Sequence, residues 1–177
     1  MPITTRILLG STMCLLTSLA VCQQPAVHKI QLTPPTIQRT ATFAVWRTDY
    51  YICTGIAYAK SLGKTVDDFA TFVGNNHSWQ SMRGKGLEPP VQLLNFAVGL
   101  YGNGKFEIVS ESDTLVTMRS NRPYATYFKD GSMLGVSIDE FERCLWGHIA
   151  ILAARIGLDF KYKIQGDQIN STLSYSK

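Results

Sequence analysis

The sequence lacks the short motifs that mark the common catalytic and cofactor-binding sites. It contains no Gly-x-Ser-x-Gly motif for a serine nucleophile, no His and Cys cluster with zinc-ligand spacing, and no glycine fingerprint for a dinucleotide. The glycine-rich bend at residues 83–86 lacks the Gly-Lys-Ser/Thr ending of a phosphate-binding loop, so we interpret it as a turn. We therefore expect no cofactor and no bound metal.

Charged residues are scarce as well, at 17% of the 177 residues against 45% hydrophobic ones. This balance excludes a disordered chain and is sufficient for a buried core in one globular domain. Basic residues exceed acidic ones by only 17 to 13, and they are spread along the chain. Such a mild excess indicates a solvated surface, and we expect no nucleic-acid partner.

The N-terminal region contains no acidic residue before Asp49 and no apolar run of membrane-spanning length. Its uncharged apolar run, residues 7–20, is shorter than the roughly 20 residues of a transmembrane helix. The run follows Arg6 and ends with Ser18 and Ala20, the small residues expected before a secretory cleavage site. The sequence therefore predicts a signal peptide at residues 1–20 and an exported protein, periplasmic or secreted.

A bacterial lipoprotein signal is an alternative interpretation of the same region. Residues 19–22, Leu-Ala-Val-Cys, resemble a lipobox, with Val21 in place of the usual Gly, Ala or Ser. In this case Cys22 becomes the lipid-modified first residue, and the acyl chains tether the protein to a membrane surface. Both interpretations place the protein outside the cytoplasm.

Two cysteines, Cys53 and Cys144, remain in the part of the chain expected to fold. Each lies on the apolar side of a predicted helix, where an unpaired cysteine behaves as a small hydrophobic residue. An oxidising compartment would also permit a disulfide between them. The sequence leaves both alternatives open.

Three helices are predicted after a proline-containing tether at residues 21–39. The first is predicted over 40–62, where apolar residues recur at helical spacing. Thr65 is expected to cap a second, short helix that ends at Gly74. A third helix is expected to start at the prolines of residues 89–90. The residues that the second helix is expected to bury are Phe69, Phe72 and Val73.

The remaining pattern is a hairpin, a long helix and a second hairpin. Alternating residues predict the hairpins at 106–118 and 160–175. Ser137 and Glu140 have the spacing of a capping box for the helix between them, and Gly157 ends it. The predicted class is α+β, with a roughly four-stranded antiparallel sheet covered by helices in a single domain at 40–177.

The order of these motifs resembles a known family. The run Asn-Arg-Pro-Tyr at 121–124, the run Gly-Val-Ser-Ile-Asp-Glu-Phe at 135–141 with Cys144, and the Gly-Leu and Gly-Asp pairs at 157–158 and 166–167 resemble the C-terminal half of L-2-amino-thiazoline-4-carboxylic acid hydrolase-like proteins. These are similar in layout to the 4-vinyl reductase and haem-NO-binding group.

The resemblance covers roughly residues 45–175, and it includes residues 59–69, which are similar to the helix-turn-helix start of such domains. It implies an α+β domain whose helices and sheet enclose a small-molecule pocket. Two cysteines frequent in the family are absent, since Arg122 precedes the proline and Gln-Ile-Asn at 168–170 follows the Gly-Asp turn.

The pair most suggestive of chemistry is Cys144 with His148. At positions i and i+4 of one helix, both side chains point the same way, as a nucleophile and its base or as two metal ligands. The alternative is that both residues are structural, a buried cysteine and a histidine packed in the core.

Arg122 before Pro123 can clamp a ligand carboxylate with its guanidinium, or it is an exposed turn residue.

Three functions are consistent with these features. The first is an exported small-molecule-binding or sensor-like domain, with or without a lipid tether at Cys22. The second is a hydrolase of the thiazoline-carboxylate type that uses Cys144 and His148. The third is a structural or partner-binding envelope protein with a filled core. The residues expected to line the pocket of the first are Trp46, Tyr50, Tyr124, His148 and Tyr162.

Overall fold

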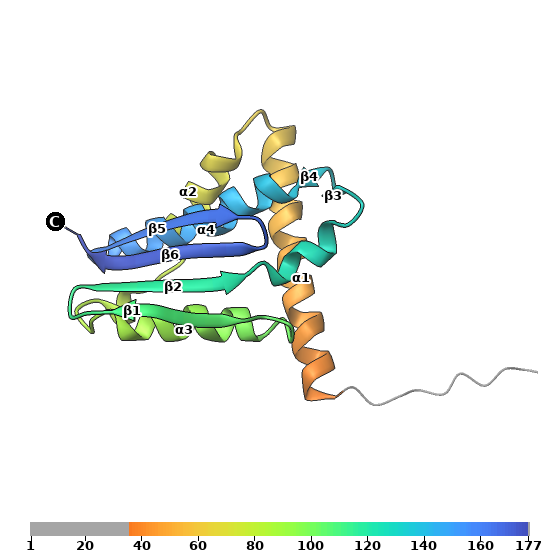
Figure 1. The fold of residues 1–177 in the computed structure, drawn as a ribbon. Helices are drawn as coiled ribbons and strands as arrows, with labels where there is room; N and C mark the ends of the chain where they lie inside the picture. The colour runs from red at the N-terminus through yellow and green to blue at the C-terminus, as the bar shows by residue number, and fades with distance from the viewer. Residues whose placement is uncertain (1–35, 177) are drawn as a thin grey trace, which may run out of the picture. The chain divides into compact units, whose positions relative to one another are not determined.

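A four-stranded antiparallel sheet backed by helices on one side forms the centre of the fold, so the predicted α+β class is confirmed (Figure 1). The computed structural model describes residues 36–176. The predicted signal peptide, Cys22 and nearly all of the predicted tether lie outside the described residues. The prediction of a tether up to residue 39 is wrong at its end, because α1 begins at Ile37, directly after its N-cap Thr36.

The two N-terminal helices start at side-chain caps. The Thr36 hydroxyl accepts from the Arg39 amide at 3.1 Å at the start of α1 (Ile37–Ser61). Thr65 and its capping-box partner Asp68 start α2 (Val66–Asn76), and this cap is confirmed. Each cap satisfies backbone N–H groups that have no partner within the helix.

The predicted end of α2 is wrong, and its buried face is predicted only in part, because Phe69 is half-buried and packs against the core. The helix continues past Gly74, and its buried residues are Val66, Ala70 and Gly74, while Phe72 is exposed. A Cβ at Gly74 would lie 2.8 Å from Ile151 of α4, so the two helices approach through small residues. The larger apolar residues are therefore displaced from the contact.

The guanidinium of Arg155 fixes the end of α2. It donates to the carbonyls of Gly74 and His77, both at 2.9 Å. This contact satisfies carbonyls at the helix C-terminus. The negative end of the helix dipole also favours the positive charge of Arg155 at this position.

A third helix, α3 (Glu88–Gly99), has prolines in its first turn as predicted, and the short 3-10 helix η1 (Gln80–Met82) precedes it. Later in the chain, the 3-10 helix η2 (Pro123–Phe128) is followed by a small hairpin of β3 (Ser132–Met133) and β4 (Val136–Ser137).

Both predicted hairpins are present. The first pairs β1 (Phe106–Glu111) with β2 (Leu115–Asn121), and the second pairs β5 (Leu158–Gln165) with β6 (Gln168–Tyr175). Strands β2 and β6 pair with each other, which gives the sheet order β1-β2-β6-β5. The hairpins are therefore joined through their second strands.

The long helix α4 (Ile138–Arg155) also starts and ends as predicted. Ser137 and Glu140 form the capping box, and Gly157 follows the helix with a φ of 86°. Glycine adopts this left-handed conformation without steric cost, which allows the chain to turn directly into β5.

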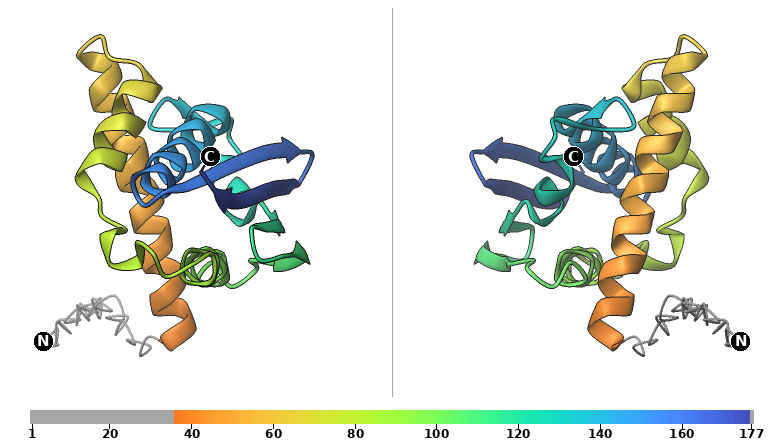
Figure 2. Two further views of the ribbon diagram at one scale, coloured as in Figure 1. Left: turned by 90° about the vertical axis from the view of Figure 1, so that its left-hand side faces the viewer. Right: turned by 90° about the vertical axis from the view of Figure 1, so that its right-hand side faces the viewer.

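The core lies between the inner face of the sheet and the helices, which occupy one side of it (Figure 2). Alternate strand residues face inward, and their neighbours form a polar outer face. The buried inward residues include Val116, Met118, Phe160, Ile169 and Leu173.

Candidate functional site

The predicted Cys144–His148 pair is not arranged as a nucleophile and a base. The His148 ring places Nδ1 at 3.1 Å from the backbone carbonyl oxygen of Cys144, and no hydrogen bond between thiol and imidazole occurs in residues 36–176. Burial raises the pKa of the Cys144 thiol to about 12 and lowers the pKa of His148. The thiol is therefore protonated near neutral pH and is a weak nucleophile.

The surroundings of His148 belong to a tight helix contact. Its ring meets that of His77 edge-on, with centroids 6.4 Å apart. A Cβ at Gly74 would lie 3.2 Å from the His148 carbonyl, so α2 and α4 are closely packed here. Within residues 36–176 no group of three or more His, Cys, Asp or Glu is placed to hold a metal ion. Cys53 and Cys144 are both unpaired and buried.

The five predicted pocket residues lie in three places. The rings of Trp46 and Tyr50 pack against each other along α1 at a tilt, with centroids 5.5 Å apart. Tyr124 and Tyr162 both contact Trp146, the first through a hydrogen bond and the second by ring packing at 5.9 Å. His148 lies at the α2–α4 contact. The predicted common pocket is therefore not formed by these side chains.

Arg122 is engaged by a carboxylate of the protein itself. Its Nε and Nη2 donate to the two oxygens of Glu142 at 2.6 and 2.9 Å. The Tyr124 hydroxyl donates to Glu142 at 2.8 Å and accepts from Trp146 Nε1 at 3.2 Å. Glu142 is buried. The predicted ligand clamp at Arg122 is thus an internal ion pair, and its fork is occupied.

A second buried carboxylate, Asp49, lies on α1. The Tyr101 hydroxyl is 2.9 Å from each of its oxygens. Burial raises the pKa of Asp49 to about 7, against the opposing effect of the Tyr101 hydrogen bond. The Tyr101 ring meets Tyr124 edge-on at 6.1 Å, so the two buried acids lie on either side of one aromatic cluster.

Local sequence patterns give little indication of these two acids. Glu142 lies near the start of a helix, where an acidic residue is expected because it interacts favourably with the helix dipole. Its partner Arg122 is 20 residues away in the sequence. Asp49 and Tyr101 are 52 residues apart. An acid at a helical position otherwise occupied by apolar residues, as Asp49 is, is the one available signal.

The aromatic cluster leaves little free space. A cavity of about 70 Å³ lies between α3, η2 and α4, beside Tyr101, Tyr124 and Trp146. Pockets for small molecules usually have volumes of about 300 Å³ or more. The cavity beside these aromatic residues is therefore too small for an ordinary ligand.

A larger apolar groove lies on the surface between α1 and α2, and its volume is about 380 Å³. Phe69 forms its floor against Gly55, where any Cβ would overlap the phenyl ring. Tyr58 and Phe72 stand in it with 66% and 63% of their surface exposed. The residues that line it are Gly55, Tyr58, Ala59, Leu62, Lys64, Asp68, Phe69 and Phe72.

A polar hollow of about 360 Å³ lies at the end of the sheet near β1 and the β5–β6 turn. Its guanidinium, Arg119, donates to Glu107 at 2.9 Å and to Asn170 at 3.3 Å. Arg119 and Glu107 thus satisfy each other within the sheet, and we consider the apolar groove the better candidate for a binding site.

Comparison with known families, with curated proteins and with solved structures gives no match for this chain. Among the described helices, none combines the length and the hydrophobicity needed to cross a bilayer.

Proposed function

We propose that this protein binds a small, mostly apolar molecule in the groove between α1 and α2. The observation that carries the proposal is the exposure of Tyr58, Leu62 and Phe72 around one concave surface. Clustered exposed apolar side chains mark binding sites more often than ordinary surface. Covering them would remove apolar area from water, which is the main favourable term in such binding.

The charges at the rim indicate which polar group the ligand carries. Lys64 lines the groove and has no acidic partner within ion-pair distance in residues 36–176, whereas Lys60 is paired with Glu140 at 2.6 Å. The Asp68 carboxylate is engaged by Thr65, which is the main cause of its lowered pKa, and the Lys64 charge makes a smaller contribution in the same direction. An apolar body with one carboxylate or sulfonate group therefore fits best.

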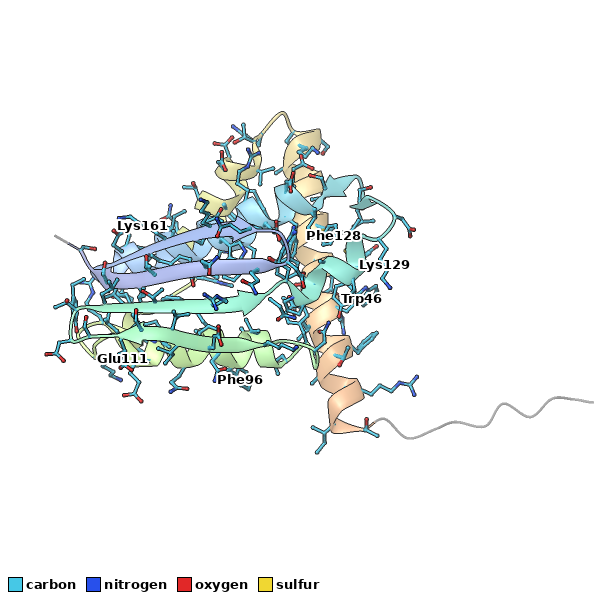
Figure 3. The ribbon with its side chains drawn as sticks, in the orientation of Figure 1. Trp46, Phe96, Glu111, Phe128, Lys129 and Lys161 are labelled. Carbon is cyan, nitrogen blue, oxygen red and sulfur yellow. The ribbon has the colours of Figure 1, made fainter. Side chains whose placement is uncertain are left out.

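Titration with 8-anilinonaphthalene-1-sulfonate tests this proposal, because the probe has both features and fluoresces when it leaves water. Phe72→Glu should weaken its binding by about tenfold or more, since it places a like charge beside the sulfonate. Phe96→Glu on α3 is the matched control, because Phe96 is also 63% exposed and lies outside the groove (Figure 3).

Two further measurements complete the test. Decanoate should displace the probe and should raise the melting temperature of the native protein but not of Phe72→Glu. Equal effects of Phe72→Glu and Phe96→Glu on probe binding would show that the groove is not the site and would refute the proposal. Export and lipidation at Cys22 remain predictions from residues 1–22.

A further inference from the structure

The N-terminal half of α1 has an exposed surface of aromatic residues. Phe43 and Tyr51 are 59% and 56% exposed, and Trp46 is 38% exposed. The rings of Phe43, Trp46 and Tyr50 follow one another along the helix, with centroids 5.9 and 5.5 Å apart. We refer to Phe43, Trp46 and Tyr51 as the aromatic face of α1. All three side chains therefore leave a large part of their surface exposed in residues 36–176.

The charges that accompany the aromatic face are all positive. Arg39 and Arg47 are exposed on the same half of α1, and the helix has a single acid, Asp49, which is buried. The Arg47 guanidinium lies over the Tyr51 ring at 5.4 Å, and its Nε donates to the Tyr51 hydroxyl at 3.0 Å. The exposed surface of α1 itself thus combines aromatic rings with cations, and the helix contributes no exposed acid to it.

This combination is typical of a helix that lies in a membrane interface. Tryptophan and tyrosine prefer the headgroup level, where one end of the ring is apolar and the other is wet. Arginine adds attraction to anionic lipids. A protein partner or a second copy would need an acidic surface to match, whereas an anionic bilayer supplies both requirements at once.

The position of α1 in the chain supports the same partner. The apolar run at residues 7–20 ends 16 residues before Ile37. At full extension those residues span at most about 55 Å. In the lipobox interpretation of this region, attachment through Cys22 would therefore keep α1 near the bilayer. The N-terminal end of α1 extends past α3 and the sheet, so a flat surface can reach it (Figures 1 and 2).

We propose that the aromatic face of α1 docks on an anionic membrane surface. Phe43, Trp46 and Tyr51 enter the headgroup layer, and Arg39 and Arg47 pair with lipid phosphates. This interaction is separate from the ligand groove, which lies at the other end of α1.

Co-sedimentation of the full chain with vesicles tests the proposal. Vesicles of phosphatidylglycerol and phosphatidylcholine are compared with vesicles of phosphatidylcholine alone. The double variant Phe43→Ser/Trp46→Ser should bind the anionic vesicles about tenfold more weakly. The matched control is Phe96→Ser/Leu93→Ser on α3, two residues 63% and 36% exposed, and it should change binding by less than about twofold.

Tryptophan quenching by brominated lipids provides a second readout that an N-terminal anchor does not obscure. Quenching should be lost in Trp46→Phe, because Trp146 is buried in the core and Trp79 is half-buried. Arg39→Gln/Arg47→Gln should weaken binding to anionic vesicles and leave binding to phosphatidylcholine unchanged.

Several outcomes would overturn the proposal. One is equal vesicle binding by the double variant and its control, together with unchanged quenching in Trp46→Phe. Another is a lipid-free dimer of the native chain that the double variant converts to a monomer, since this would assign the face to a second copy. Phe72→Glu should bind vesicles like the native chain, so failure of the groove proposal leaves this test intact.

Discussion

The hydroxyl of Tyr101 lies 2.9 Å from both carboxylate oxygens of Asp49, in the interior between α1 and the end of α3. Among the side chains of residues 36–176, Tyr101 is the hydrogen-bonding partner of this acid. One neutral donor does not compensate for the burial of a full charge. This explains why the pKa of Asp49 is raised from 3.8 to about 7.

The raised pKa of Asp49 predicts an unusual pH dependence of stability. The folded protein binds this proton more tightly than the unfolded chain does, so the free energy of unfolding should fall as the pH rises from about 4 to about 7. Asp49→Asn should remove this fall, which is on the order of a few kcal/mol. Urea denaturation of both proteins between pH 4.5 and pH 8 measures the difference.

The difference between the two proteins isolates Asp49 from other groups. Burial lowers the pKa of His148, so stability is lost as the pH falls below about 6.5, but this occurs in both proteins. Tyr101→Phe removes the hydrogen bond that holds the Asp49 pKa down, so it should extend the fall to higher pH. Parallel stability curves for the native protein and Asp49→Asn would contradict the assignment.

The Arg122–Glu142 pair is predicted to be structural. Arg122→Met leaves the buried Glu142 without its counter-ion and should cost about 3–5 kcal/mol of unfolding free energy. Arg122→Met/Glu142→Leu should recover much of this loss, because no unpaired charge remains. Chemical denaturation measures both variants. The control is Arg119→Met, whose exposed pair with Glu107 should contribute less than about 1 kcal/mol.

An Arg122 that served a ligand instead would behave differently. Arg122→Met would then leave the fold nearly as stable as the native protein and would weaken the binding of a carboxylate such as decanoate. That pair of results would restore the ligand-clamp interpretation of the Arg-Pro sequence.

The α2–α4 contact predicts opposite effects for two helical glycines. Gly74→Ala places a Cβ 2.8 Å from Ile151 and should destabilise the protein by about 1–3 kcal/mol. Gly99→Ala, in the last turn of α3, meets no atom within 4 Å and should be neutral or stabilising by up to about 1 kcal/mol. Thermal unfolding compares them, and equal stability of the two variants would argue against close packing at Gly74.

The two buried thiols are predicted to be unreactive in the folded protein. The pKa of each thiol, Cys53 and Cys144, is raised to about 12, and burial is the main cause. Iodoacetamide at pH 8 should label both slowly, and labelling should become at least about a hundredfold faster in urea, because the thiolate is the reacting form.

Mass spectrometry of the peptides distinguishes these thiols from Cys14 and Cys22. Fast native labelling of Cys144 alone, with loss of hydrolysis of a thiazoline carboxylate in Cys144→Ser, would support the hydrolase hypothesis. A disulfide-linked pair of peptides would instead show that Cys53 and Cys144 are joined.

The sequence by itself determined the elements whose causes are local. The capping boxes at Thr65 and Ser137, the prolines that start α3 and the stop at Gly157 depend on groups within a few residues of each other, so their spacing predicted them correctly. The alternating strands likewise predicted two hairpins and the α+β class.

The tertiary structure alone decided which side chains meet. It paired Arg122 with Glu142 and Tyr101 with Asp49, and it turned the small residues of α2 inward so that Phe72 remained in an open groove. Pairs 20 or 52 residues apart leave no periodic signal, because their contact depends on how helices pack on the sheet. The same packing separated Trp46, Tyr124 and His148, and it left the aromatic face of α1 exposed.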